Sequence, residues 1–339
     1  MTTYFSTFIS GLQEPVKKAL EQDLKNIKVK LLLDGLVVYE TDKPIMEIKN
    51  LRYLNNTFIL FRLLKEEVQM QNLVKSVLRE PDILSRVPSE LLKKVHSFRV
   101  IASKENQFVS VDKNILAKVE ELISKKLKLK LNRSLPDVEV WFLMRNEGYS
   151  FVGLRITKTP NYEKTLHKGE LRPELANIMC LLTELKPNDV VLDPFAGYGS
   201  IPLECAKYFK VSRIYAGEKD KSIFKPLLEK SKGLSPKLIV GKWDGLNLSS
   251  LTDNTIDKII TDPPWGVYQK ETMDIKSFYE DMLKEFIRLV KSNGLLVILT
   301  AQKELFENLL NTFSQFELVG KYDVLVSGKK AAIYKMRLK

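Results

Sequence analysis

A short stretch at the end of a predicted strand carries the residues best suited to chemistry. Residues 259–268 read IITDPPWGVY, which predicts a buried strand followed by Asp262, Pro263, Pro264 and Trp265. The two prolines fix φ and remove N–H donors, so carbonyl oxygens remain as the available backbone groups. A carboxylate beside a rigid carbonyl forms an acceptor pair for an exocyclic amino group. The Trp265 ring can stack on the flat base that carries this amine.

This combination suits methyl transfer to an amine. The lone pair of an exocyclic amine is normally delocalised into the base. Two acceptors can hold the amine in a geometry in which the lone pair points at an electrophilic methyl group. They also favour the positive charge that develops on nitrogen during transfer. The stretch therefore predicts an amine-methylating site.

A second motif, VVLDPFAGYGSIPLE, predicts where a methyl donor binds. An apolar strand ends in Asp193, and the loop Gly197-Tyr198-Gly199 leads into a helix that begins near Ser200. The spacing lacks the third glycine of a dinucleotide fingerprint. The two glycines let the backbone approach a ligand closely. The Asp193 carboxylate favours a cationic or donor-bearing ligand over a pyrophosphate, and a sulfonium with an amino-acid tail fits that preference.

Two further acids follow the next two predicted strands. Glu218 ends the strand in IYAGEKD, where a carboxylate can accept hydrogen bonds from both hydroxyls of a ribose. Asp244 follows the strand in GKWDGL and can accept from an adenine amino group. Asp193 and Asp262 also follow predicted strands, so four predicted strands each end in an acid. Ligands of parallel sheets bind at the carboxyl ends of the strands, so these acids are expected at one edge.

Alternating elements must position these acids. Helices are predicted at 174–185, 200–209, 222–233, 275–291 and 303–313, and strands at 189–195, 211–218, 237–244, 256–264 and 294–301. This alternation predicts an α/β fold with a doubly wound, mostly parallel sheet. The last two apolar runs, 316–327 and 330–339, suit an antiparallel hairpin at the sheet edge.

The first half of the chain reads as α+β pieces without a catalytic-looking cluster. We expect a hairpin that turns at Asp34-Gly35, a helix capped by Asp112, and two strands around the turn at 146–148. The basic run 124–134 suits phosphate contacts and a solvated helix face equally. A polar, proline-punctuated stretch at 159–173 then reads as a linker.

Composition narrows the class of protein. The 339 residues, 44% of them hydrophobic, favour two domains and allow three. The net charge of +12 divides evenly: residues 1–150 hold 25 Lys and Arg against 19 Asp and Glu, and the rest of the chain carries the other half. A basic field over both halves suits a nucleic acid that lies across both, and lysine-rich codon usage is the alternative explanation.

The sequence also predicts the cellular compartment in which the chain works. Charges interrupt every apolar stretch, so a membrane span is not expected, and the N-terminus lacks the pattern of a secretory signal. Cys180 and Cys205 are isolated and form no metal-ligand spacing, so we expect no metal site. Two isolated cysteines indicate a reduced, cytoplasmic chain.

The motifs together resemble a known family. The C-terminal half resembles the class I S-adenosylmethionine-dependent methyltransferases, in which [DN]PP[YFW] marks the amino-methylating branch. More narrowly, HKGELRPELANIMCLL, VLDPFAGYGSIPLECA and TDPPWG resemble the THUMP-domain RNA guanine-N2 methyltransferases that act on tRNA. The resemblance is strong over about 166–300 and weaker before it. It implies a ferredoxin-like region at 1–50, a THUMP-like RNA-binding domain at 51–157, a linker at 158–170 and a Rossmann-like methyltransferase domain at 171–339.

The resemblance also implies roles for individual residues. S-adenosyl-L-methionine is the implied cofactor and tRNA the implied substrate. The implied donor site consists of Asp193, Pro194, Ala196, Gly197, Gly199, Glu218, Lys219, Asp244, Gly245 and Asp262. Within it, Glu218 would hold the ribose and Asp244 would lie near the adenine. Asp262, Pro263, Pro264 and Trp265 would hold the target amine. Two departures stand out: the family's usual aromatic residue is tyrosine where this chain has Trp265, and Tyr198 replaces a small polar residue and could cover part of the donor pocket.

Other functions stay open at this point. Asp-Pro-Pro-Trp also occurs in adenine-N6 methyltransferases of RNA, and ribosomal RNA is a second possible guanine-N2 substrate. A non-catalytic RNA-binding protein with a methyltransferase fold would carry damaged motifs, yet all four acids are present. A carbon-5 pyrimidine methyltransferase needs a cysteine beside Asp262, and this chain has none there. The modified position, the number of methyl groups and the oligomeric state are not predicted.

Overall fold

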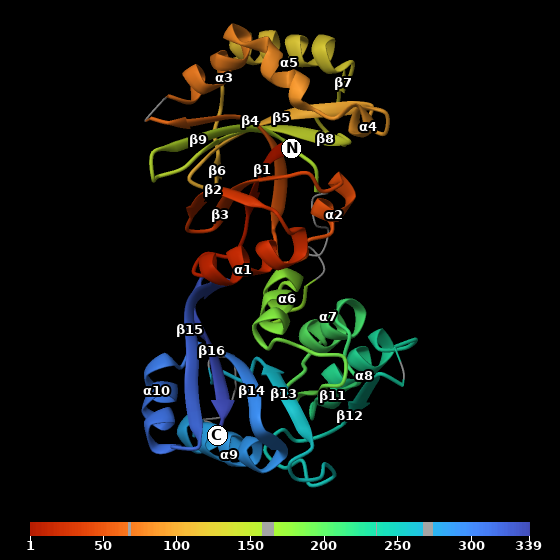
Figure 1. Cartoon of the computed structure of the whole chain (residues 1–339), viewed down its shortest axis with the longest axis vertical. Helices are drawn as coiled ribbons and strands as arrows, with labels where there is room; N and C mark the ends of the chain where they lie inside the picture. Colours follow the sequence, from red (N-terminus) through yellow and green to blue (C-terminus); the bar gives the residue numbers. More distant parts are fainter. Residues whose placement is uncertain (67–68, 158–165, 235, 267–273) are drawn as a thin grey trace. The chain divides into compact units, whose positions relative to one another are not determined.

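The chain forms two compact units in the computed structural model, which describes residues 1–66, 69–157, 166–234, 236–266 and 274–339 (Figure 1). One unit comprises Met1–Thr7 and Leu20–Pro160, and the other comprises Phe8–Ala19 and Asn161–Lys339. Most of the expected linker, 158–165, lies outside the described residues. The domain ranges expected from the sequence stay a prediction.

The first unit is built on a nine-stranded sheet with the order β2-β3-β1-β4-β9-β8-β5-β6, and β7 pairs with β5. Its strands are β1 Thr2–Thr7, β2 Lys28–Leu33, β3 Leu36–Thr41, β4 Asn56–Lys65, β5 Ser97–Lys104, β6 Gln107–Phe108, β7 Lys130–Leu131, β8 Val138–Met144 and β9 Tyr149–Arg155. Its helices are α2 Ile45–Lys49, α3 Met70–Arg79, a 3₁₀ helix Pro81–Arg86, α4 Ser89–Leu92 and α5 Lys113–Leu127. Helix α1, Gln13–Leu24, contributes residues to both units.

The first four strands with α1 and α2 follow the β-α-β-β-α-β order of ferredoxin-like folds. The fourth strand, β4, lies beyond residue 50 and pairs with both β1 and β9, so the sheet continues into the later strands. Stacked rings of Phe5 and Phe58, with centroids 4.4 Å apart, join β1 to β4. The predicted hairpin at Asp34-Gly35 is confirmed, as is the Asp112 cap, whose Oδ1 accepts from the N–H groups of Asn114 and Ile115.

The second unit is built on a seven-stranded sheet with the order β12-β11-β10-β13-β14-β16-β15. Its strands are β10 Val190–Asp193, β11 Arg213–Gly217, β12 Leu238–Gly241, β13 Ile256–Thr261, β14 Val290–Thr300, β15 Phe316–Val326 and β16 Lys329–Leu338. Its helices are α6 Pro173–Leu182, α7 Ser200–Tyr208, α8 Lys221–Lys230, α9 Ile275–Leu289 and α10 Lys303–Thr312. Within the described ranges, no helix has the length and apolar character to cross a membrane.

The topology confirms the predicted doubly wound sheet. Strands β10 to β14 pair in parallel, while β16 runs antiparallel to β14 and β15. Helices α9 and α10 pack on one face through a buried cluster that includes Phe286, Phe306 and Tyr334, and α6 to α8 lie on the other face (Figure 1). The strand order reverses between β10 and β13. Ligands of such sheets bind at this point, outside the carboxyl ends of the strands.

Candidate active site

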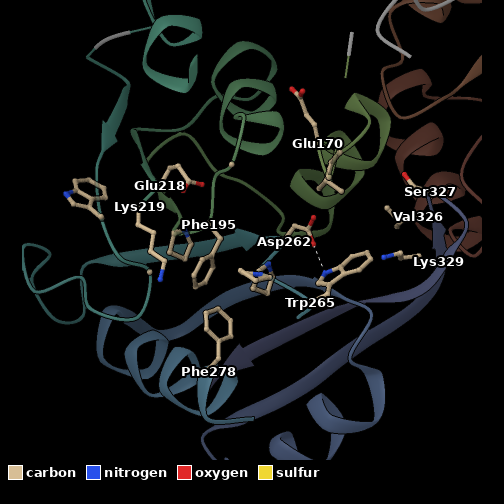
Figure 2. A pocket seen from close by; sticks show the side chains of 18 residues that line it. Glu170, Phe195, Glu218, Lys219, Asp262, Trp265, Phe278, Val326, Ser327 and Lys329 are labelled. Atoms are coloured by element: carbon tan, nitrogen blue, oxygen red, sulfur yellow. Dashed lines mark hydrogen bonds between the residues drawn. The ribbon is translucent and has the colours of Figure 1, made fainter. Parts of the chain in front are cut away.

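A cavity of about 290 Å³ opens at the carboxyl ends of the parallel strands, where the strand order reverses (Figure 2). Residues from the strand ends, from the segment before α6, from α9 and from the β15–β16 turn line it. The lining residues are Gly169, Glu170, Leu171, Pro194, Phe195, Gly197, Glu218, Lys219, Trp243, Gly245, Asp262, Pro263, Pro264, Trp265, Phe278, Val326, Ser327 and Lys329.

Asp193 lies behind the wall of this cavity at the end of β10. It is 1% exposed, and its Oδ1 accepts hydrogen bonds from Thr261 Oγ1 (2.8 Å) and from the Phe195 N–H (3.2 Å). These bonds tie the end of β10 to the end of β13 and to the loop that follows. Burial raises the pKa of Asp193 to about 7, although both hydrogen bonds favour the ionised form.

The raised pKa of Asp193 predicts a pH-dependent contribution to stability. The folded state keeps the proton up to about pH 7, whereas the unfolded carboxyl loses it near its ordinary pKa. The free energy of unfolding should therefore fall as pH rises from about 4 to 7, by at most about 1.4 kcal/mol per pH unit from this group. Denaturant titrations of the wild type and Asp193→Asn at several pH values would measure the difference. Parallel curves for the two proteins would contradict this assignment.

Glu218 lies at the cavity where β11 ends. It is half-buried, and its Oε1 accepts a hydrogen bond from the Asp220 N–H at 2.7 Å. Burial raises the pKa of Glu218, and hydrogen bonds from backbone N–H groups oppose this shift. Beside it, Lys219 Nζ lies 3.5 Å from Asp244 Oδ2, which is exposed. A carboxylate in the position of Glu218 can accept hydrogen bonds from a pair of ligand hydroxyls.

Aromatic rings line the same end of the cavity. The rings of Phe195 and Phe278 lie 5.4 Å apart, and Trp243 joins them in the lining. Two glycines make room for these rings. A Cβ at Gly241 would lie 2.0 Å from the Trp243 ring, and a Cβ at Gly245 would lie 2.5 Å from the Phe195 ring. The rings provide an apolar surface that suits a flat heterocycle.

Asp262 and Trp265 form the centre of the cavity wall beyond β13. The indole Nε1 of Trp265 donates to Asp262 Oδ1 at 2.9 Å (Figure 2). This bond leaves Oδ2 as the second acceptor of the carboxylate. Burial raises the pKa of Asp262, the Trp265 hydrogen bond lowers it, and the charge of Asp193 raises it further. A cationic ligand or an amine donor at this point would favour the ionised form.

Two side chains hold the Pro-Pro-Trp turn in place. Tyr279 Oη, which also bonds to Thr300 Oγ1, donates to the Pro264 carbonyl at 3.3 Å. Gln302 Nε2 donates to the Trp265 carbonyl at 2.6 Å. Within the described part of the chain no donor reaches the Pro263 carbonyl. The carbonyl of Pro263, which lines the cavity, can therefore serve as a backbone acceptor for a ligand.

The loop residue Tyr198 binds the segment that precedes α6. Its ring stacks on His167, with centroids 3.9 Å apart and 11° between the planes. Lys230 Nζ donates to the Tyr198 carbonyl (3.3 Å) and to Glu170 Oε1 (2.9 Å), and Glu170 Oε2 accepts from the His167 N–H. Tyr198 is not among the lining residues. Its partners His167 and Lys230 both bond to Glu170, which does line the cavity, so the effect of Tyr198 on the cavity passes through this segment.

The structure brings most of the predicted site residues to the cavity. Pro194, Gly197, Glu218, Lys219, Gly245, Asp262, Pro263, Pro264 and Trp265 line it, whereas Asp193, Ala196, Gly199 and Asp244 do not. Ala196 is buried, and Gly199, at φ +95°, packs where a Cβ would meet Leu227 at 2.6 Å. For these four residues, direct contact with a donor stays a prediction.

Sequence reasoning missed several lining residues. Phe195 lies two residues after Asp193, and Trp243 directly precedes Asp244. This closeness in sequence to predicted site residues was the signal that could have identified them. Gly169 to Leu171 lie in the HKGELRP stretch that resembles the family, although no role was predicted for them. Phe278 and the β15–β16 turn gave no such signal. Cys180 and Cys205 are both buried, in α6 and α7, and neither lines the cavity that contains Asp262.

The residues present fit S-adenosylmethionine. Gly197 has φ +53°, which L side chains rarely adopt, and a Cβ there would meet no atom within 4 Å, so the backbone faces open space. The aromatic end suits an adenine, and Glu218 suits a ribose. Burial raises the pKa values of Asp193, Glu218 and Asp262, and a sulfonium cation would compensate such carboxylates.

The 3-2-1-4-5 parallel strand order, the acid–glycine loop at the switch point and the Asp-Pro-Pro-Trp turn define a class I, S-adenosylmethionine-dependent methyltransferase. The model of one protein family, described as UPF0020, RMKL-like, methyltransferase domain, matches residues 160–331. The chain belongs to this family. The class predicted from the sequence is confirmed.

Curated relatives extend the likeness beyond the matched domain. The tRNA (guanine(6)-N2)-methyltransferase of Methanocaldococcus jannaschii is 24% identical over 387 residues, which cover 99% of this chain and 100% of the relative. The enzyme of the same name from Thermus thermophilus is 27% identical over 63% of this chain and 65% of its own length. A tRNA (guanine(10)-N2)-dimethyltransferase of M. jannaschii is 26% identical over 62% of this chain and 63% of its own length.

Solved structures support the fold of both units. TrmN from Thermus thermophilus matches with a TM-score of 0.80 and 22% identity, and the match covers all of both chains. SMU.472, solved in complex with SAH, matches with a TM-score of 0.70 and 13% identity over 98% of this chain and 97% of its own. At these identities the likeness shows a shared fold.

Proposed function

We propose that this chain transfers a methyl group from S-adenosylmethionine to the exocyclic N2 amine of a guanosine in tRNA. The observation that carries the proposal is the acceptor pair formed by the Asp262 carboxylate and the Pro263 carbonyl, next to the Trp265 ring at one cavity. The names of the relatives support tRNA and guanine N2 over the alternatives of ribosomal RNA and adenine N6. We place the reaction in the cytoplasm, as the tRNA-modifying relatives and the free thiols suggest.

The chain's own residues divide the work of catalysis. The bound donor supplies an electrophilic methyl group on a sulfonium. Glu218 and the aromatic end of the cavity would hold the donor's ribose and base. Asp262 Oδ2 and the Pro263 carbonyl would accept the two hydrogens of the target amine, which turns its lone pair away from both acceptors and out of conjugation. Asp262 would also stabilise the positive charge that develops on the nitrogen.

The rigidity of the turn matters for this role. Tyr279 and Gln302 fix the carbonyls of Pro264 and Trp265, and the indole N–H fixes one carboxylate oxygen of Asp262. Preorganised acceptors need no reorganisation during the reaction, which makes their electrostatic effect large. A paired guanosine must leave its stack to reach them, and Trp265 offers the base a new stacking partner.

The full-length relative leads us to propose position 6 as the target. That enzyme is named for guanine 6 and aligns over 99% of this chain and 100% of its own length, whereas the relative named for guanine 10 aligns over 62% of this chain. Nucleoside mass spectrometry of a tRNA transcript after incubation with the protein and donor tests the base. N2-methylguanosine is expected, and a guanosine-to-adenosine change at position 6 should abolish it. N6-methyladenosine as the product would refute the proposal.

We assign RNA binding to the first unit. Its basic run 124–134 lies at the end of α5 and in β7, and Lys125, Lys126, Lys128, Lys130 and Arg133 are all exposed. Lys126 pairs with Asp82, and Arg133 pairs with Glu120, whereas Lys128 and Lys130 have no acidic partner among the described residues. Exposed lysines that lie close together suit the phosphates of an RNA backbone.

Replacing Lys128 and Lys130 together by glutamine should weaken tRNA binding and its salt dependence. Each lost phosphate contact reduces the slope of log affinity against log salt by about 1. Filter-binding titrations at several salt concentrations measure both effects. The matched control is Lys113→Gln with Lys118→Gln, two exposed lysines at the other end of α5. Equal slopes for the two double variants would contradict the assigned contact.

A further inference from the structure

The turn between β15 and β16 brings a lysine to one end of the cavity. Ser327 and Lys329 belong to the lining, together with the residues of the amine-holding turn. Figure 2 shows Asp262 and Trp265 between this turn and Glu218, and Lys329 points toward Trp265. The turn therefore lies on the acceptor side of the site, opposite the residues that suit the donor's ribose and base.

The strands β15 and β16 are joined by a tight two-residue turn. Ser327 has φ +49° and Gly328 has φ +81°, as a two-residue type I′ hairpin turn requires. Val326 pairs with Lys329 across the turn, and residues 331–336 of β16 are buried. A strand anchored in the core thus fixes the position from which the Lys329 side chain extends.

Strand geometry separates the two lysines that follow the turn. Successive side chains on a strand point to opposite faces. Lys329 is half-buried and lines the cavity, whereas Lys330 is exposed and does not. The two residues carry the same charge at neighbouring positions, so one can serve as the control for the other.

Charge differs between the two ends of the cavity. At the donor end, Glu218 offers a carboxylate, and the ammonium of Lys219 pairs with Asp244. At the hairpin end, Lys329 is the cation in the lining as far as the chain is described, and Ser327 adds a hydroxyl. The donor end therefore offers a carboxylate to a cationic ligand, and the hairpin end offers an ammonium and a hydroxyl as hydrogen-bond donors.

We propose that Lys329, with the Ser327 hydroxyl, binds the phosphodiester adjacent to the target nucleotide. This inference rests on the proposed function. A base that stacks on Trp265 and offers its amine to Asp262 still carries its sugar and phosphate, which must lie outside the stack. An ammonium and a hydroxyl at the acceptor end supply hydrogen-bond donors for a phosphate oxygen. The contact holds the flipped nucleotide in the site without reading its base.

The test compares Lys329→Gln, Lys329→Arg and Lys330→Gln in the full chain, with a tRNA transcript as the probe. Lys329→Gln should weaken tRNA binding about 5- to 10-fold at low salt and reduce the slope of log affinity against log salt by about 1. Lys329→Arg should restore most of the affinity, and Lys330→Gln should change it less than about 2-fold. Calorimetry should give wild-type donor affinity for all three variants.

Three results would overturn the inference. Lys329→Gln could keep the wild-type salt slope, Lys330→Gln could weaken tRNA binding as much as Lys329→Gln, or Lys329→Gln could weaken donor binding instead of tRNA binding. The last result would assign Lys329 to the donor. If the wild type fails to methylate tRNA at guanosine, the proposed function itself is wrong. If the wild type methylates tRNA and Lys329→Gln binds it normally, only the phosphate contact is wrong.

Discussion

Asp262→Asn should slow methyl transfer by about 100-fold or more while donor affinity stays near that of the wild type. The amide keeps the shape of the side chain and one acceptor oxygen but loses the charge. The positive charge that develops on the amine would then be less stabilised, and removal of one preorganised electrostatic partner has an effect of this size. Single-turnover transfer to a tRNA transcript, measured alongside donor calorimetry, separates the chemical step from binding.

The pH dependence of the wild type provides a second readout. Burial raises the pKa of Asp262, so the ionised fraction of this carboxyl grows with pH, and the rate of methyl transfer should rise as pH increases.

The control variant for Asp262→Asn is Asp281→Asn, because Asp281 lies exposed on α9 and pairs with Lys284. Near-wild-type transfer by Asp262→Ala would refute the mechanism. Loss of donor binding in Asp262→Asn would instead assign Asp262 to the donor.

Glu218→Ala should weaken donor binding by about 1–3 kcal/mol, which corresponds to about 5- to 150-fold in affinity. The substitution leaves two ligand hydroxyls without their acceptor in a partly enclosed site. Glu218→Gln should lose less, because its amide oxygen can still accept the hydrogen bond from the Asp220 N–H. Calorimetry with the donor and with its demethylated product measures both variants.

The matched control for Glu218 is Glu229→Gln. Glu229 is exposed on α8, pairs with Lys232 and lies outside the cavity lining. Its substitution should leave donor affinity within about 2-fold of the wild type. A folded Glu218→Ala protein with unchanged donor affinity would mean that another group holds the ribose.

The sequence predicted the sheet and its binding edge because the physical signals are local. Buried parallel strands appear as apolar runs, and acids that follow such runs must meet at one edge when the strands pair in parallel. Asp262, Glu218 and the glycine loop could therefore be assigned to one site from the sequence alone. The antiparallel β15–β16 hairpin was predicted for the same reason, from two apolar runs around a short polar turn.

Other features depend on tertiary packing, which a single sequence does not encode in any local pattern. Asp193 and Asp262 both end apolar strands, yet Asp193 is buried behind the wall and bonds to Thr261, while Asp262 lines the cavity. The stacking of His167 on Tyr198 joins residues 31 positions apart. The contribution of Lys329 to the site requires knowing where the hairpin turn points.

The most direct test of the central claim removes the amine itself. Inosine differs from guanosine by the absence of the exocyclic N2 amine, so a ligated tRNA with inosine at position 6 keeps the shape and charge of the substrate. We predict that the wild-type protein binds this tRNA, methylates the matched guanosine tRNA in a single turnover and transfers no methyl group to the inosine tRNA. Equal methyl transfer to both would contradict the claim that Asp262 and Pro263 hold the N2 amine of guanosine for methylation.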